Sequence, residues 1–146
     1  MRANPLIDKK VVSARLEKPR KYIRILHFLR KTPLSSFKKH IEKYGLAEHY
    51  LHLSIECILD TGTHIISSMG YGTPSTYEDV FKILGKHGVL PSAFVKKLKG
   101  LAGLRNILVH EYMDIDIDQV YAHLNKIGLF EEFSLYIAKF LKHESK

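Results

Sequence analysis

One long segment of the sequence repeats its apolar residues at the spacing of an α-helix. Between residues 46 and 69 the apolar positions recur every three or four residues, and they are Leu51, Ile55, Ile58, Leu59, Ile65, Ile66 and Met69. This spacing places them on one face of a helix, which other elements must cover. Because strand signals are scarce elsewhere and similar spacings recur along the chain, the sequence predicts an all-helical fold.

Further helices are expected on both sides of this segment. A first helical region should cover residues 11–31, with a kink or restart at Pro19, because proline has no amide hydrogen to donate. A short segment capped by Ser35 or Ser36 should end at Gly45. The remaining expected helices cover residues 77–86, a stretch from residue 91 to the end of the Leu104–Tyr112 segment, and residues 117–142, the last with an interruption at Gly128.

Length and composition favour one domain over residues 1–146. A chain of 146 residues with 45% hydrophobic residues can bury one core without covalent staples. The single cysteine, Cys57, excludes a disulfide scaffold. The sequence has no apolar run of the roughly 20 residues that cross a bilayer, and its first residues do not resemble a signal peptide. We therefore expect a cytoplasmic protein with no membrane partner.

The positive charge is concentrated at the beginning of the chain. The formal net charge is +8, but residues 1–45 contain 13 Lys and Arg against three acidic residues, while the rest of the chain is slightly acidic. Such a surface can follow a phosphate backbone or bind an acidic protein, or it can simply be a solvated helix face. Charge alone does not decide among these, and the role of these 45 residues stays open.

The segment Leu104-Arg105-Asn106-Ile107-Leu108-Val109-His110-Glu111-Tyr112 carries the residues for phosphate chemistry. Histidine can take a proton from a ribose 2′-hydroxyl or donate one to the leaving oxygen, and arginine can stabilise charge on the phosphoryl oxygens. Positions 105 and 110 differ by about 140° on an ideal helix. We therefore expect His110 to lie where the helix frays or turns, or to act together with a second subunit.

The same segment resembles the R-x4-H-x-Y motif of HepT-type toxins of the HEPN superfamily. Arg105, His110 and Tyr112 match its fixed positions, and Asn106 stands at the polar position after the arginine. The resemblance extends to the helix L-S-I-E-C-I-L-D-T-G-T-H-I-I and to Y-E-D-V-F-K-I-L-G-K-H-G-V-L-P. Pro19 departs from the first helix of the family, which is usually uninterrupted.

The resemblance implies a four-helix-bundle-like HEPN domain with short extra helices that forms a homodimer. It also implies the toxin of a type VII-like toxin–antitoxin pair, a metal-independent endoribonuclease that needs no cofactor. Arg105 and His110 would be its catalytic residues. The partner would be a minimal nucleotidyltransferase antitoxin, which neutralises the toxin by transferring AMP to Tyr112. Whether the RNA substrate is tRNA or mRNA, and whether this copy is active, is left open.

Acidic residues of the long helix supply a candidate supporting contact. His52, Glu56 and Asp60 are spaced by four, so they share one side of that helix. We expect Glu56 or Asp60 to meet Arg105, either orienting it for catalysis or forming a purely structural ion pair, while Asn106 supports the site or hydrogen-bonds the backbone. Zinc is disfavoured because no H-E-x-x-H motif or cysteine pair is present.

Two alternative functions belong to other classes. A non-catalytic helical subunit could bind and complete a nucleotidyltransferase through the same basic surface. A module that binds RNA without cutting it would also use the cationic residues but would not need His110. The sequence does not separate these alternatives from an endoribonuclease.

Overall fold

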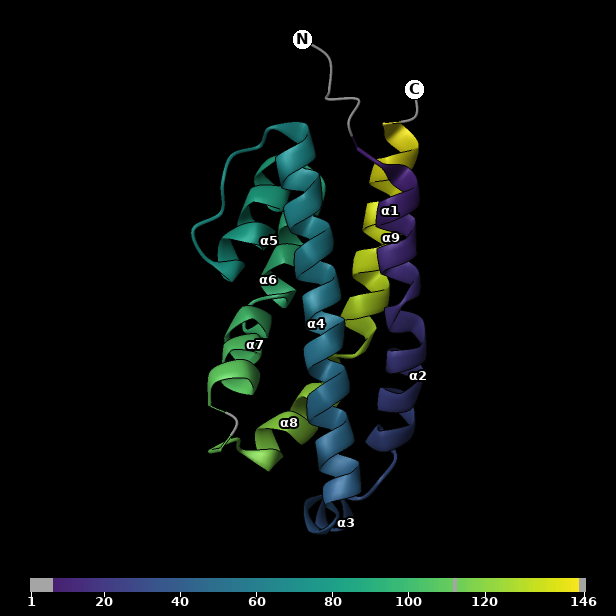
Figure 1. Ribbon diagram of the computed structural model, residues 1–146, viewed down its shortest axis with the longest axis vertical. Coiled ribbons are helices and arrows are strands. Elements are labelled where there is room, and N and C mark those ends of the chain that lie inside the picture. The colour runs from purple at the N-terminus through teal and green to yellow at the C-terminus, as the bar shows by residue number, and fades with distance from the viewer. Residues whose placement is uncertain (1–6, 112, 145–146) are drawn as a thin grey trace.

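The computed structural model describes residues 7–111 and 113–144, and these residues are almost entirely helical (Figure 1). The helices are α1 (Lys9–Glu17), α2 (Pro19–Arg30), α3 (Leu34–Lys39), α4 (Ile41–Met69), α5 (Tyr77–Lys86), α6 (Ser92–Lys97), α7 (Leu101–His110), α8 (Ile117–His123), the 3-10 helix η1 (Leu124–Lys126) and α9 (Gly128–His143). No strand occurs within these ranges, which confirms the predicted all-α class. None of the described helices is both long and apolar enough to cross a membrane.

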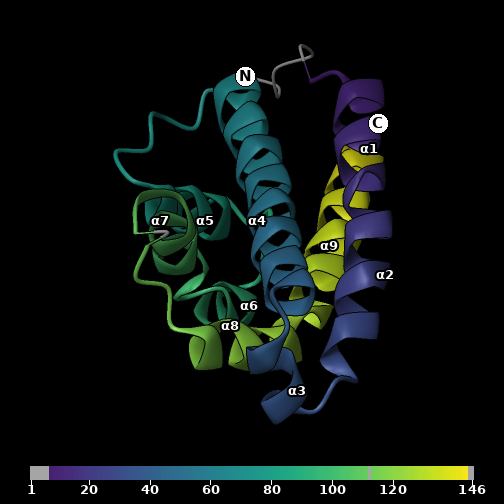
Figure 2. The same cartoon turned by 60° about the horizontal axis from the view of Figure 1, so that its bottom comes forward.

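Helix α4 forms the middle of the bundle. Helices α1 and α2 run antiparallel to α4 on one side of it, where α9 also lies, and α5, α6 and α7 follow one another along its other side (Figures 1 and 2). Helices α3 and α8 lie near one end. The predicted four-helix-bundle-like arrangement with short extra helices is therefore present.

The apolar face predicted for the long helix forms the centre of a continuous hydrophobic core. Its residues Leu51, Ile55, Ile58, Leu59, Ile65 and Ile66 are all buried. Phe37, Phe94, Phe130 and Phe133 reach the same core from α3, α6 and α9. Burial of these side chains supplies the main free energy for packing the helices together.

The proline in the first helical region divides it as predicted. Helix α1 ends at Glu17 and α2 begins with Pro19 at its first position, where the missing amide hydrogen costs no helical hydrogen bond. Lys18 joins the two helices and keeps helical backbone angles. The departure from an uninterrupted first helix is therefore a restart with little change of direction (Figure 1).

The beginning of α4 differs from the sequence expectation. The helix starts at Ile41 and passes through Gly45, which was expected to end a short segment. That short segment is α3, which ends at Lys39 and has Pro33, not Ser35 or Ser36, at its N-cap. His40 adopts an extended conformation between the two helices, so the chain breaks there and not at the glycine.

Two expected helices are each divided in the structure. The stretch from residue 91 forms α6 and α7, because Gly100 takes a φ of 99°, in the left-handed region that favours glycine. The stretch 117–142 forms α8, η1 and α9, and Gly128 begins the last of these helices. Asp116 caps α8 by accepting a hydrogen bond from the Asp118 amide.

Helix α5 packs very closely on α4. An added Cβ at Gly62 would lie 2.6 Å from Val80 Cγ1 and 3.1 Å from Leu84 Cδ1, so the glycine is what permits this approach. Thr76 starts α5 with a capping box shared with Asp79. Together these features place Tyr77, the first residue of α5, near the side of α4 that faces α7.

Candidate active site

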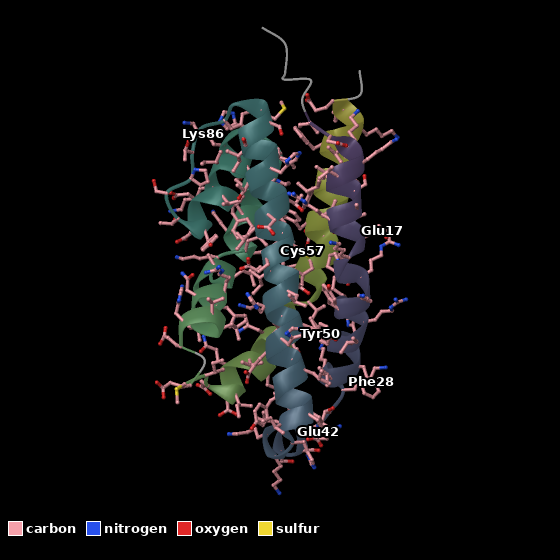
Figure 3. All side chains as sticks on the ribbon, in the orientation of Figure 1. Glu17, Phe28, Glu42, Tyr50, Cys57 and Lys86 are labelled. Atoms are coloured by element: carbon pink, nitrogen blue, oxygen red, sulfur yellow. The ribbon has the colours of Figure 1, made fainter. Side chains whose placement is uncertain are left out.

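A hydrogen bond between α7 and α4 fixes the arginine of the motif. Arg105 Nε donates to Glu56 Oε1 at 2.6 Å, and the Arg105 side chain is only 13% exposed. Glu56 precedes Cys57, which Figure 3 labels about halfway along α4. The expected contact between helices is therefore present, with Glu56 as the partner.

Arg105 stays protonated in this setting. Burial by itself lowers the pKa of its guanidinium, but the hydrogen bond and charge of Glu56, with a contribution from Tyr77, raise that pKa above its ordinary value. His52 Nε2 lies 3.7 Å from the same Glu56 oxygen. The carboxylate of Glu56 thus connects a permanent cation with a histidine one turn away on its own helix.

An aromatic ring covers the guanidinium of Arg105. The Tyr77 ring centre lies 4.2 Å from Arg105 Cζ, within the range of a cation–π interaction. Glu56 holds the guanidinium at its edge while Tyr77 lies over its face, so two different elements limit its orientation. Tyr77 was not among the residues predicted from the sequence.

The histidine of the motif is the last residue of α7. His110 is exposed, and the chain leaves the helix at Glu111, whose backbone has non-helical angles. This confirms the expectation that His110 lies where the helix ends. No hydrogen bond or ion pair engages its side chain within the described part of the chain. Arg105 and His110 are therefore placed by one helix, the first restrained and the second open to solvent.

The other proposed supporting residues have different surroundings. Asn106 is exposed, and its Oδ1 accepts a hydrogen bond of 3.4 Å from Arg105 Nη1. Asp60 lies one turn beyond Glu56 and makes no hydrogen bond to Arg105. Its backbone carbonyl accepts a bond of 3.4 Å from Arg15 Nη1 of α1. The predicted contact thus falls to Glu56 and not to Asp60.

Partial burial and nearby charge shift the pKa of Asp60. Partial desolvation, followed by the negative charge of Glu56, raises the pKa of its carboxyl above the ordinary value, while Arg15 and Arg105 act in the opposite direction. Asp60 therefore senses the electrostatic field of the Glu56–Arg105 pair without a direct bond to it.

Two further points concern the predicted modification site and metal ligands. Tyr112 lies outside the described residues, so its position in the site is not assigned. Across residues 7–111 and 113–144, no three His, Cys, Asp or Glu side chains gather closely enough to hold a metal ion. His52 and Glu56 approach each other, but as a pair next to Arg105 and not as part of a larger ligand set.

The contact of Tyr77 with Arg105 was not predicted from the spacing of residues in the sequence. Tyr77 lies 28 positions before Arg105, and nothing in its local spacing identifies a partner on α7. The only useful signal was its place at the start of the helix expected over residues 77–86. Its contact with Arg105 depends on how α5 and α7 pack side by side on α4.

Comparison with known proteins places the chain among relatives. Residues 13–137 match the model of the family described as Ribonuclease HepT-like. The tRNA nuclease HepT of Aphanizomenon flos-aquae is 30% identical over 131 residues, which cover 90% of this chain and 88% of that protein. The mRNA nuclease HepT of Shewanella oneidensis is 31% identical over 80 residues, 53% of this chain and 59% of that one.

Solved structures show the same fold. The HEPN toxin of Shewanella oneidensis, in tri-AMPylated form and in complex with an MNT antitoxin, superposes with a TM-score of 0.80 at 22% identity, covering 91% of this chain and 99% of that one. The cytosolic protein YutE of Bacillus subtilis superposes with a TM-score of 0.73 at 27% identity over 90% and 92% of the two chains.

The helical bundle and the matched sequences define the class of this protein, which is an endoribonuclease. Its described residues form helices and no strand. The match covers most of the chain and includes the whole of α7, with Arg105 and His110. The chain belongs to the Ribonuclease HepT-like family.

Proposed function

We propose that this protein is the toxin of a HEPN/nucleotidyltransferase toxin–antitoxin pair, and that Arg105 and His110 cut its RNA substrate without a metal ion. The observation that carries the proposal is the restraint of Arg105 by Glu56 at 2.6 Å, on the helix whose exposed last residue is His110. A fixed cation and an accessible imidazole are the two kinds of group that this chemistry requires.

Arg105 stabilises the transition state. Negative charge gathers on the non-bridging phosphoryl oxygens when the ribose 2′-oxygen attacks phosphorus. A guanidinium that is already oriented meets this charge without first reorganising. Glu56 and Tyr77 act as positioning residues, because they restrict the orientation of the guanidinium and do not need to touch the RNA.

His110 transfers the protons of the reaction. In its neutral form it takes the proton of the 2′-hydroxyl while that oxygen bonds to phosphorus. In its protonated form it donates a proton to the 5′-oxygen as the bond from that oxygen to phosphorus breaks. One imidazole does not start in both forms at once. A homodimer that brings two copies of α7 together would supply the acid and the base from separate chains.

The proposed partner is a minimal nucleotidyltransferase that modifies Tyr112. In this step the phenol loses its proton and its oxygen bonds to the α-phosphorus of ATP, pyrophosphate leaves and AMP remains on the tyrosine. Tyr112 follows His110 by two positions, so the added phosphate would put negative charge and bulk close to the RNA site. The related toxin of Shewanella oneidensis, solved in AMPylated form with its antitoxin, supports this assignment.

Cleavage by two matched histidine variants tests the catalytic proposal. His110 and His143 are both exposed last residues of helices, α7 and α9 respectively. We expect His110→Ala to abolish cleavage of tRNA or single-stranded RNA while His143→Ala retains it, and we expect wild-type activity to survive EDTA.

Two outcomes would contradict this proposal. Unmodified wild-type protein that cuts RNA no faster than His110→Ala would favour a non-catalytic subunit of a nucleotidyltransferase. RNA affinity that survives in a wild type without cleavage would favour a binding module. Sedimentation at micromolar concentration tests the homodimer, since a monomer would leave one imidazole to provide both proton transfers.

A further inference from the structure

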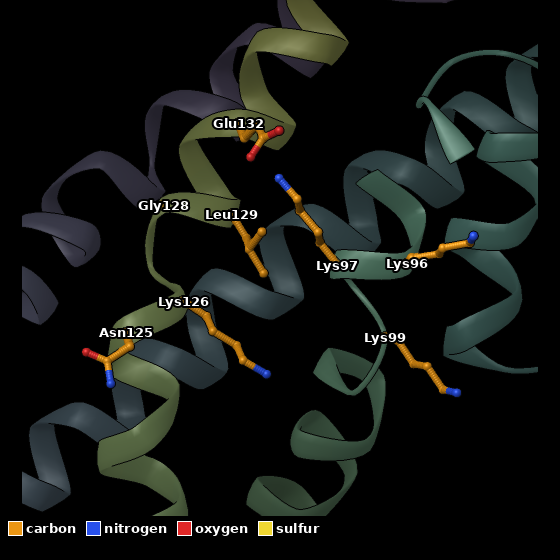
Figure 4. A pocket seen from close by; sticks show the side chains of 8 residues that line it. All are labelled: Lys96, Lys97, Lys99, Asn125, Lys126, Gly128, Leu129 and Glu132. Atoms are coloured by element: carbon orange, nitrogen blue, oxygen red, sulfur yellow. The ribbon is translucent and has the colours of Figure 1, made fainter. Parts of the chain in front are cut away.

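Four lysines line a groove that contains none of the residues of the site described above. The groove has a volume of about 660 Å³ and lies among the end of α6, η1 and the start of α9 (Figure 4). Its lining residues are Lys96, Lys97, Lys99, Asn125, Lys126, Gly128, Leu129 and Glu132.

Positive charge in this groove is largely uncompensated. All four lysines are exposed, and none of them forms an ion pair with any carboxylate in the described ranges. Glu132 is the one acidic residue of the lining, and Figure 4 shows Lys97 extending toward it. Arg30 adds a further cation near the rim, because its Nε donates to Asn125 Oδ1 at 3.2 Å. Several like charges around one hollow favour an anionic ligand.

We propose that this groove, which we call the lysine groove, binds the phosphate backbone of the RNA substrate away from the cleavage site. This proposal rests on the proposed ribonuclease function. Lysine is depleted at protein–protein interfaces, where aromatic side chains and arginine contribute most of the affinity. The lysine groove has Leu129 as its one apolar side chain and no aromatic residue. Phosphates, in contrast, are commonly bound by lysine without regard to base sequence.

The position of the lysine groove relative to α7 supports RNA as the occupant. Lys99 lies in the link between α6 and α7, and α7 runs from Leu101 to His110. A helix of that length extends about 15 Å. A strand of a few nucleotides can span this distance, so one RNA molecule can contact the lysine groove and the Arg105–His110 region together. Phosphate contacts here would hold the strand without specifying its sequence.

A comparison of two triple variants tests the proposal. Lys97→Gln/Lys99→Gln/Lys126→Gln removes three charges from the lysine groove. Lys86→Gln/Lys139→Gln/Lys142→Gln removes three charges from exposed lysines of α5 and α9 that do not line it. Figure 3 places Lys86 at one end of the molecule, and Lys139 lies eleven residues beyond the start of α9. The two proteins therefore carry the same net charge in different places.

RNA affinity is measured in the His110→Ala background, so that cleavage does not consume the probe. The probe is a labelled single-stranded RNA oligonucleotide, titrated at several KCl concentrations. We expect the groove variant to bind on the order of tenfold more weakly, with a salt slope smaller in magnitude by about 2, since each lost contact to single-stranded RNA removes roughly 0.7. The control variant should keep a slope close to that of the parent.

The outcomes separate this inference from the proposed function. Equal binding by the groove and control variants would overturn the inference, even if the wild type cuts RNA. A groove variant that keeps its RNA affinity but loses a nucleotidyltransferase partner would also overturn it, and would assign the surface to a protein. Because binding is measured without cleavage, a wild type that fails to cut RNA would contradict the proposed function alone.

Discussion

Arg105 and Glu56 lie 49 positions apart in the sequence, yet a hydrogen bond of 2.6 Å joins their side chains across α7 and α4. The acceptor is placed by the middle of the longest helix and the donor by a ten-residue helix packed against it. The orientation of the guanidinium is therefore a product of helix packing. Substitutions of the residues that contact Arg105 should affect catalysis even where those residues do not contact RNA.

The first prediction concerns the ring over Arg105. Tyr77→Phe keeps the aromatic face and should retain most of the activity. Tyr77→Ala removes it and should lower kcat about tenfold, because a cation–π contact of this kind is worth roughly 0.5–2 kcal/mol. Steady-state cleavage of a labelled RNA separates kcat from KM. A loss confined to KM would instead indicate that Tyr77 contacts the RNA.

The second prediction concerns stability. Glu56→Ala leaves the largely buried Arg105 guanidinium without its carboxylate, so we expect the free energy of unfolding to fall by about 2 kcal/mol. Glu48→Ala, on the same helix, is the control. Desolvation raises the pKa of the Glu48 carboxyl, so its charged form does not stabilise the fold. Urea unfolding compares the two variants, and similar losses in both would argue against the ion pair as the cause.

The third prediction concerns Asp60 and pH. Its raised pKa means that the folded protein binds the proton more tightly than the unfolded chain, so this group makes stability fall as pH rises above about 4, the ordinary pKa of aspartate. Asp60→Asn should therefore melt no lower than the wild type at pH 7, and the difference between the two should shrink in acid. Thermal melts at several pH values provide the measurement.

The same variant separates Asp60 from Glu56 in catalysis. Because Asp60 makes no hydrogen bond to Arg105, Asp60→Asn should reduce cleavage less than Glu56→Gln does. An equal or larger reduction in cleavage rate for Asp60→Asn would instead indicate that Asp60 supports the site directly.

The fourth prediction concerns regulation at Tyr112. After co-expression with the cognate nucleotidyltransferase, intact-mass spectrometry should detect added AMP on the wild type and on Tyr71→Phe, but not on Tyr112→Phe. The Phe variant should also escape neutralisation if it remains an active nuclease. Unmodified wild type in a stable, inactive complex would instead indicate that the partner blocks the site by binding alone.

The sequence predicted the long helix and the cross-helix arginine contact because both depend on regular spacing. Residues on one face of α4 recur every three or four positions, and that repeat survives in the fold. The break between α6 and α7 was missed because Phe94, Leu98, Leu101, Leu104 and Leu108 keep a helical spacing across Gly100. These residues are buried on both sides of the break, so the apolar periodicity does not reveal that the helix ends there.

Contacts that depend on how several helices pack together were not predicted, because residue spacing along the chain does not encode them. Tyr77 meets Arg105 because Gly62 lets α5 approach α4 closely, which is a property of three helices at once. The lysine groove likewise combines α6, η1 and α9, and it brings Lys126 close to three lysines that lie 27 to 30 positions earlier in the chain. Charge counts over the sequence drew attention to residues 1–45, whereas all four lysines of the groove lie later.

The central position of α4 gives the two halves of the site different local stabilities. Glu56 lies halfway along a helix that packs against α1, α2, α5, α7 and α9, so its backbone is held by the central packing of the fold. His110 ends its helix and can be released by the fraying of a single turn. Amide hydrogen exchange around Glu56 should therefore follow global unfolding, while exchange at the end of α7 should proceed through small local openings. RNA would therefore bind next to a rigidly held Arg105 guanidinium and a His110 imidazole that can change its position.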